Sequence, residues 1–422
     1  MKKIIAFIII LTIIFSAASI PAGAAEIKNG KTDYPYIFVH GMGGWGSETP
    51  YYSLSPYWGG GLMPGSETDI IEILNENSIE AYAPSVGPLS SAWDRACELY
   101  AQLTGTVVDY GKAHSEAHGH DRYGFSYEGK ATMGEPWNLK DKINLVGHSF
   151  GGATVRLFTS LLAFGDADEI AATGKDTSPL FKGGYDDCIH ACITLSAPHN
   201  GSQVANQLVD PEFTMAIMAT ALNMIGMVFG NDFLVFAFQL GHMGLTPKQD
   251  EFRACLSIDG INSYYKTNDN CGYDMTLRGA AELNEKIRLS PNTYYYSYTT
   301  ENTWDITEYE LPADGLNLIF YISSMMLASS KGKTVDGIKI EGDWAKNDGI
   351  VPLASARYPS CDEETALSYE AEIEKGNKIK PGRWYYFEPM TGMDHFDFCG
   401  TKDYPEGFEE FYFGMVNTAN SR

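Results

Sequence analysis

The chain has 422 residues, of which 44% are hydrophobic and 13% aromatic. This content supports a large packed core and excludes a disordered or fibrous chain. With 30 Lys and Arg against 54 Asp and Glu, the formal net charge is −24. Phosphate backbones repel so acidic a chain, so we expect no binding to nucleic acid, and any contact with lipid must be apolar.

The first 24 residues have the pattern of an export signal rather than of a folded element. Lys2 and Lys3 form a basic start, residues 4–15 are apolar, and Ala22-Gly23-Ala24 is a small-residue cleavage site. The apolar run is shorter than the ~20 residues of a membrane span. We therefore expect a signal peptide over residues 1–24, a mature chain over 25–422, and a secreted, extracellular protein.

Short apolar segments alternate with longer helical patterns along the mature chain. This alternation predicts an α/β fold with a mostly parallel central sheet in one catalytic domain. Two stretches fit it poorly: residues 87–135, which read as an insertion, and residues 211–230, which are apolar with four Met. The latter predicts either a buried core helix or a mobile lid over a site. The expected strands are residues 36–40, 79–84, 143–147, 189–195, 293–299 and 384–388.

The motif Gly147-His148-Ser149-Phe150-Gly151 lies directly after an expected strand and before a helical pattern over residues 153–164. A sharp turn from strand to helix projects a serine hydroxyl, and small residues are needed two positions before and after it. The pattern predicts a nucleophile elbow with Ser149 as the nucleophile.

A serine needs an oxyanion site and a base to react at neutral pH. Residues 40–44 (His-Gly-Met-Gly-Gly) follow the first strand and have the pattern of an oxyanion loop, with Met42 and Phe150 as the backbone donors. In a hydrolase of this kind the acid and then the histidine follow the serine along the chain. Asp348 and His395 occur in that order, although each alone could be a turn aspartate or a surface histidine.

Several longer stretches of the sequence are distinctive, namely residues 87–103, 108–114, 116–120, 196–201 and 290–294. They resemble secreted triacylglycerol lipases of Gram-positive bacteria, of the staphylococcal and thermophilic Bacillus type. The resemblance implies an α/β-hydrolase fold, and the family's triad falls on Ser149, Asp348 and His395. It also implies a helical lid over about residues 205–240.

The resemblance further implies two structural metal ions. A zinc-binding insertion would comprise about residues 87–135 and 240–275, and imidazole and carboxylate ligands without a thiolate suit a closed structural zinc site. A calcium site would take oxygen ligands, although Asp397 stands where the family usually has Glu. The implied zinc ligands are Asp94, His114, His120 and Asp274, and the implied calcium ligands are Asp397, Asp403 and the carbonyls of Gly315 and Tyr404.

Together these patterns predict a secreted lipase that hydrolyses triacylglycerol esters at an oil–water interface through a Ser-His-Asp acyl-enzyme mechanism. Two alternatives keep the same fold but change the substrate, namely a phospholipase and a short-chain carboxylesterase. A third alternative is a secreted binding protein without catalytic activity.

Overall fold

The computed structural model describes most of the chain. The expected signal peptide and the apolar stretch 211–230 lie outside the described residues, as does most of the expected lid. The second part of the expected zinc-binding insertion is described only from residue 267 on. The described ranges are residues 32–49, 52–53, 55–59, 68–208, 267–306, 309–400 and 407–422.

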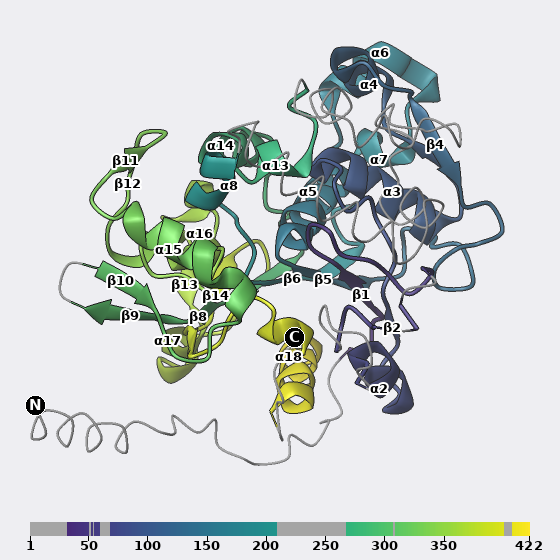
Figure 1. The fold of residues 1–422 in the computed structure, drawn as a ribbon. Coiled ribbons are helices and arrows are strands. Elements are labelled where there is room, and N and C mark those ends of the chain that lie inside the picture. Colours follow the sequence, from purple (N-terminus) through teal and green to yellow (C-terminus); the bar gives the residue numbers. More distant parts are fainter. Residues whose placement is uncertain are drawn as a thin grey trace, which may run out of the picture.

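A seven-stranded parallel sheet forms the centre of the molecule, which confirms the predicted fold class (Figure 1). All six expected strands belong to it. The seventh, β13, has two residues, too few for a recognisable apolar pattern. In spatial order the strands are β13 Leu367–Ser368, β14 Trp384–Tyr386, β7 Tyr294–Tyr298, β6 Ile189–Leu195, β5 Ile143–His148, β1 Tyr36–Val39 and β2 Ala81–Tyr82.

Helices cover both faces of the sheet. Their bounds are α2 Ile70–Glu76, α3 Ala92–Thr104, α4 Lys112–His118, α5 Phe150–Phe164, α6 Ala167–Thr173, α7 Pro179–Lys182, α8 Gln203–Leu208, α13 Cys271–Asp274, α14 Leu277–Lys286, α15 Tyr321–Ser329, α16 Leu353–Arg357, α17 Tyr369–Glu374 and α18 Phe408–Asn420. Five 3₁₀ turns accompany them among the described residues: Gly174–Asp176, Leu318–Phe320, Gly342–Trp344, Ser360–Asp362 and Asp397–Cys399.

Successive side chains of β1 point to opposite faces of the sheet, so the core forms two layers, one on each face. Ile37 and Val39 pack with apolar residues of α3 and α5, whereas Tyr36 and Phe38 pack with residues of α2 and α18. Figure 1 shows α3 and α5 above the sheet and α2 and α18 below it. Each such fully buried side chain stabilises the fold by roughly 1.5–3 kcal/mol.

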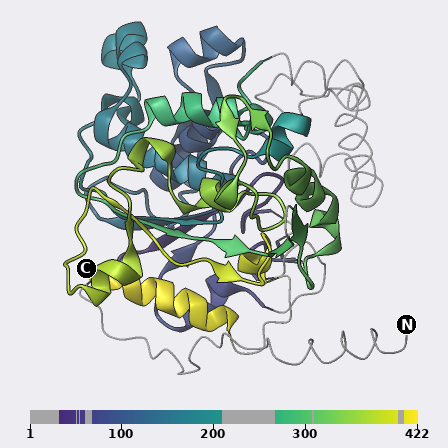
Figure 2. The same ribbon diagram turned by 90° about the vertical axis from the view of Figure 1, so that its left-hand side faces the viewer.

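Four small two-stranded sheets flank the central one. Three are antiparallel, and the pair of β8 and β15 is parallel. In Figure 2 the yellow C-terminal helix α18 runs beneath the central sheet. The pairs are β3 Val107–Asp109 with β4 Tyr123–Ser126, β9 Thr303–Ile306 with β10 Tyr309–Pro312, β11 Thr334–Val335 with β12 Ile338–Lys339, and β8 Thr300–Glu301 with β15 Met390–Thr391.

Helix α3 has defined signals at both ends. The Ser91 hydroxyl accepts from the Asp94 N–H at its start, and Gly105 ends it with φ +63°. The helix packs on α5 and is buried along almost its whole length. Its first turn therefore holds Asp94 and Arg95 at fixed positions in the interior.

The carboxyl ends of β1 and β5 lie side by side, because Val39 pairs with Gly147 in parallel register. In an open parallel sheet, the loops at this edge form the ligand crevice. The loop after β1 and the turn after β5 therefore meet where a site is expected.

Candidate active site and metal site

Ser149 occupies a strained turn between β5 and α5. Its φ of +55° and ψ of −129° fall in a region that residues with a side chain rarely adopt. A Cβ at Gly147 would lie 2.4 Å from the Gly151 oxygen, and one at Gly151 would lie 2.1 Å from the Val39 oxygen. The turn thus requires glycine at both positions, as the motif predicts.

Asp348 and His395 form a buried pair. The Nδ1 of His395 lies 2.8 Å from the Asp348 Oδ2. The carboxylate is fixed in turn, because its Oδ1 accepts from the N–H groups of Ile350 at 3.1 Å and Val351 at 2.8 Å. A proton on Nδ1 that is donated to Asp348 leaves Nε2 of His395 as the basic nitrogen.

His395 lies beside the elbow through its backbone. Its carbonyl oxygen is 2.8 Å from the Nε2 of His148, the residue that precedes Ser149. The structure thus brings the loop of His395 to the turn that carries Ser149, although the two are separated by more than 200 residues in the sequence.

The loop after β1 presses directly on Ser149. A Cβ at Gly41 would lie 2.7 Å from the Ser149 Cβ, so only glycine fits. Gly43, with φ +68°, donates its N–H to the Pro88 carbonyl at 2.9 Å, which fixes the turn around Met42. The Phe150 N–H lies at the first position of α5, where the helix dipole favours negative charge.

Two buried side chains donate to the carbonyl oxygen of Gly41. The His40 Nδ1 is 2.9 Å from it and the Arg95 Nη1 is 3.4 Å. Burial lowers the pKa of His40 to about 3 and that of Arg95 to about 10, so at neutral pH the imidazole is uncharged and the guanidinium charged. Because this carbonyl and the Met42 N–H belong to one peptide group, donation to the oxygen makes that N–H a stronger donor.

Arg95 also contacts the other side of the expected oxyanion site. Its Nη2 donates to the His40 carbonyl, and its guanidinium lies 5.1 Å from the centre of the Phe150 ring. Sequence reasoning missed this residue. Its position in the sequence carries no signal, because Arg95 belongs to α3 and only packing brings it to the loop.

A second group of four side chains lies in the insertion. Asp94 of α3, His114 of α4, His120 and Asp269 each offer one ligand atom, and these atoms all lie within 4.8 Å of one another. The Nε2 of His114 is 3.2 Å from Asp94 Oδ1 and from Asp269 Oδ2, and that of His120 is 3.2 Å from Asp269 Oδ2. Within the described ranges this is the one group with three or more such ligands.

These distances fit a tetrahedral ion. Zn²⁺ bonds of about 2.0 Å place neighbouring ligand atoms about 3.3 Å apart. The Nδ1 of His120 lies 2.9 Å from the Asp121 carbonyl, which only accepts, so this nitrogen carries a proton and Nε2 faces the group. Both buried Nε2 atoms, of His114 and His120, make no hydrogen bond of good geometry. Two carboxylates and two imidazoles, whose Nε2 atoms face one another, therefore fit a divalent cation.

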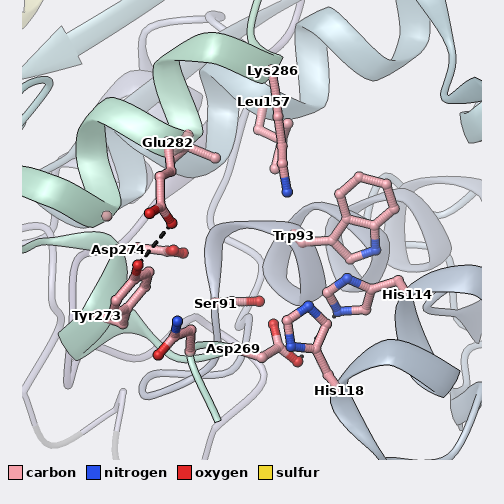
Figure 3. Close-up of a pocket in the computed structure, with 13 residues that line it drawn as sticks. Ser91, Trp93, His114, His118, Leu157, Asp269, Tyr273, Asp274, Glu282 and Lys286 are labelled. Carbon is pink, nitrogen blue, oxygen red and sulfur yellow. Dashed lines mark hydrogen bonds and ion pairs between the residues drawn. The ribbon is translucent and has the colours of Figure 1, made fainter.

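The structure corrects the fourth expected zinc ligand, because Asp269 and not Asp274 joins this group. Asp274 ends α13, and its Oδ2 accepts from the Ala92 N–H at the start of α3, at 2.8 Å. Burial raises the pKa of its carboxyl to about 7. In Figure 3 Asp269 lies beside His114 and His118, whereas Asp274 lies across the pocket near Tyr273.

The expected calcium ligands are only partly described. Asp403 and Tyr404 lie outside the described residues. Asp397 is buried, and its Oδ2 accepts from the Asp394 N–H at 2.7 Å. The Asp394 Oδ2 accepts from the Asn317 N–H at 3.0 Å, so the segment after Gly315 lies next to the loop of His395.

The fold and the site define a class of protein. A parallel sheet carries a serine on a strained strand-to-helix turn, with an aspartate–histidine pair and a glycine loop beside it. This is the arrangement of an α/β-hydrolase.

The chain belongs to the family of the lipase-like C-terminal domain, whose model matches residues 32–419. It is 34% identical to a lipase of Staphylococcus epidermidis over 404 residues, which cover 93% of this chain and 54% of that protein. The chain thus spans about half the length of the curated relatives it matches.

Two solved structures resemble it over nearly their full length. Staphylococcus hyicus lipase is 30% identical with a TM-score of 0.75, and covers 93% of this chain and 97% of its own. EstA from Clostridium botulinum is 30% identical with a TM-score of 0.76, and the match covers 95% of this chain and 92% of EstA. Among the helices of the described ranges, none is long and apolar enough to cross a membrane.

Proposed function

We propose that this chain is an exported lipase that hydrolyses the carboxylic esters of triacylglycerols. The observation that carries the proposal is the buried Asp348–His395 pair beside the strained Ser149. The His395 Nδ1 lies 2.8 Å from the Asp348 Oδ2. Membership in the lipase-like family supports the choice of an ester substrate.

In the proposed reaction, the Ser149 Oγ attacks the ester carbonyl while His395 Nε2 takes the hydroxyl proton. The N–H groups of Met42 and Phe150 stabilise the oxyanion, and Asp348 holds the imidazole in the required tautomer. His395 then gives the proton to the leaving alcohol. A water molecule, activated by the same nitrogen, attacks the acyl-enzyme and releases the fatty acid.

The first test replaces the nucleophile. Ser149→Ala should lower turnover of emulsified tributyrin by several orders of magnitude, because the acyl-enzyme cannot form. The melting temperature should stay at or above that of the wild type, since alanine needs no more space in the turn. Undiminished hydrolysis by this variant would contradict the proposal.

The substrate class needs its own assay. A triacylglycerol series that extends above and below the solubility limit should show higher initial rates on the emulsified esters. Activity confined to dissolved short-chain esters would instead indicate a carboxylesterase, and a preference for phosphatidylcholine a phospholipase.

We further propose that Asp94, His114, His120 and Asp269 hold a structural Zn²⁺. Imidazole nitrogen and carboxylate oxygen are zinc ligands, and four protein ligands leave no open position for catalysis. A Ca²⁺ ion bound by Asp397, Asp403 and the carbonyls of Gly315 and Tyr404 is a separate proposal, supported by the nearness of the segment after Gly315 to the loop of His395. Metal analysis of the purified protein tests both.

A further inference from the structure

A chain of buried hydrogen bonds joins three segments of the active site. The Gly41 N–H donates to the Tyr57 hydroxyl at 2.9 Å, and this hydroxyl lies 2.7 Å from the His148 Nδ1. On the other side of the ring, the His148 Nε2 lies 2.8 Å from the His395 carbonyl oxygen. The chain thus runs from the loop after β1, through the elbow, to the loop of the expected catalytic histidine.

The chemistry of the end groups determines where each proton lies. The His395 carbonyl only accepts, so the His148 Nε2 carries a proton. Burial lowers the pKa of His148 well below its usual range, so the ring is neutral and its Nδ1 has no proton. Because this Nδ1 has no proton, the Tyr57 hydroxyl, which accepts from Gly41, can donate to it. This arrangement of protons satisfies every member of the chain.

The surroundings keep this chain dry. Tyr57 is 2% exposed and His148 is fully buried, and the ring of Trp58 packs against both. The Cys399 thiol lies 3.5 Å from the same Nδ1, as a weaker neighbour. Where water cannot replace a lost partner, a broken hydrogen bond leaves a buried polar group unsatisfied, and the backbone around it shifts.

Both ends of the chain are residues whose position affects the reaction. Gly41 lies against Ser149 and precedes Met42, one of the two proposed oxyanion donors. The His395 backbone is fixed by its N–H, which donates to the Asp348 carbonyl at 2.9 Å, and by the bond from His148. Moving either backbone would change the geometry of the reacting groups.

We infer that Tyr57 and His148 are positioning residues, which together hold the oxyanion loop and the catalytic histidine in register with Ser149. The inference rests on the proposed function. It predicts a loss of kcat rather than of substrate binding, because both side chains are buried and act through the backbones of Gly41 and His395.

The test uses Tyr57→Phe, which removes only the hydroxyl. We expect kcat on dissolved p-nitrophenyl butyrate to fall about 10- to 100-fold, as for small misplacements of reacting groups, with KM within about twofold. Active sites are counted with a fluorophosphonate, so that kcat refers to folded enzyme. Tyr36→Phe is the matched control, since its equally buried hydroxyl donates to Asn420 at 2.7 Å, within the layer of α18. It should lose stability but keep kcat.

A second pair of variants separates positioning from a general loss of stability. In His148→Gln the amide nitrogen can take the place of Nε2 and donate to the His395 carbonyl, whereas in His148→Asn it is too short to do so. We expect the Gln variant to keep at least several-fold more kcat per titrated site than the Asn variant.

The outcomes are distinct. A Tyr57→Phe variant with wild-type kcat per site overturns the inference, and so does an equal loss of kcat in Tyr36→Phe. Equal kcat in the Gln and Asn variants overturns the role of the His148–His395 bond. A wild-type chain that neither reacts with the fluorophosphonate nor hydrolyses the ester overturns the proposed function and the positioning role with it.

Discussion

At the scale of single residues, the site depends on backbone positions that only particular side chains allow. At Gly41, Gly147 and Gly151 a Cβ would clash with a neighbouring segment, so only glycine fits. They let the loop after β1, β5 and the start of α5 approach closely enough to hold Ser149 in its strained conformation. The reactive geometry is therefore built from residues without side chains as much as from the polar residues around them.

The carboxylate of Asp348 has a role that the amide of an asparagine at this position cannot take. Asp348→Asn should lower kcat by about 10³- to 10⁴-fold, because an amide can favour the wrong tautomer of His395 and cannot stabilise its charged form. Steady-state hydrolysis of a dissolved ester, with sites titrated, measures this effect. Asp336→Asn is the control, since Asp336 lies exposed in the turn between β11 and β12. Similar kcat values in the two variants would contradict the assignment.

At the scale of elements, α3 links the two sites. Its first turn carries Asp94 of the metal group and Arg95, which donates to the loop after β1. The N-terminus of α4 is held in turn by Glu169, which accepts from the His114 N–H at 2.7 Å. These helices therefore position metal ligands and oxyanion loop in one packed layer.

Two aspartates five residues apart give opposite predictions. Asp269→Asn should lower the zinc bound per chain, because it weakens a ligand. Asp274→Asn should leave zinc bound and change stability by about 1–3 kcal/mol, because it alters only the acceptor for the Ala92 N–H. Atomic spectroscopy after dialysis and thermal unfolding measure the two effects. Loss of zinc in Asp274→Asn with full zinc in Asp269→Asn would reverse the correction made from the structure.

At the scale of the whole molecule, the metal group joins segments that are distant in the sequence. Residues 94, 114, 120 and 269 meet only in the folded chain, so an ion bound to them stabilises the native state alone. At a free zinc concentration of 1,000 times Kd, this stabilisation is about 4 kcal/mol.

Removal of the metal should therefore lower the melting temperature. Without the cation, its binding free energy no longer stabilises the native state, so the chelated protein should unfold several degrees below the untreated one. Differential scanning calorimetry before and after treatment with a chelator measures the shift, and added Zn²⁺ should restore it. An unchanged melting temperature in a preparation shown to be zinc-free would refute the structural role.

Much of the central fold follows from local sequence patterns. The apolar runs that become β1, β5 and β6 are long enough to be read without knowledge of their neighbours. The glycines of the elbow likewise require a turn at Ser149. Helix α5, however, begins at Phe150, three residues before the expected start, because the helix grows directly out of the turn.

The sequence by itself determined the class of fold, the elbow and the candidates for acid and base, because each rests on spacing within a short segment or on order along the chain. Only the tertiary structure decided between Asp269 and Asp274, which occupy the same short segment and differ in which part of α3 they meet. It alone revealed Tyr57 and His148 as partners of Gly41 and His395. The contacts among Gly41, Tyr57, His148 and His395 arise from packing. Packing of distant segments leaves no local pattern in a single sequence.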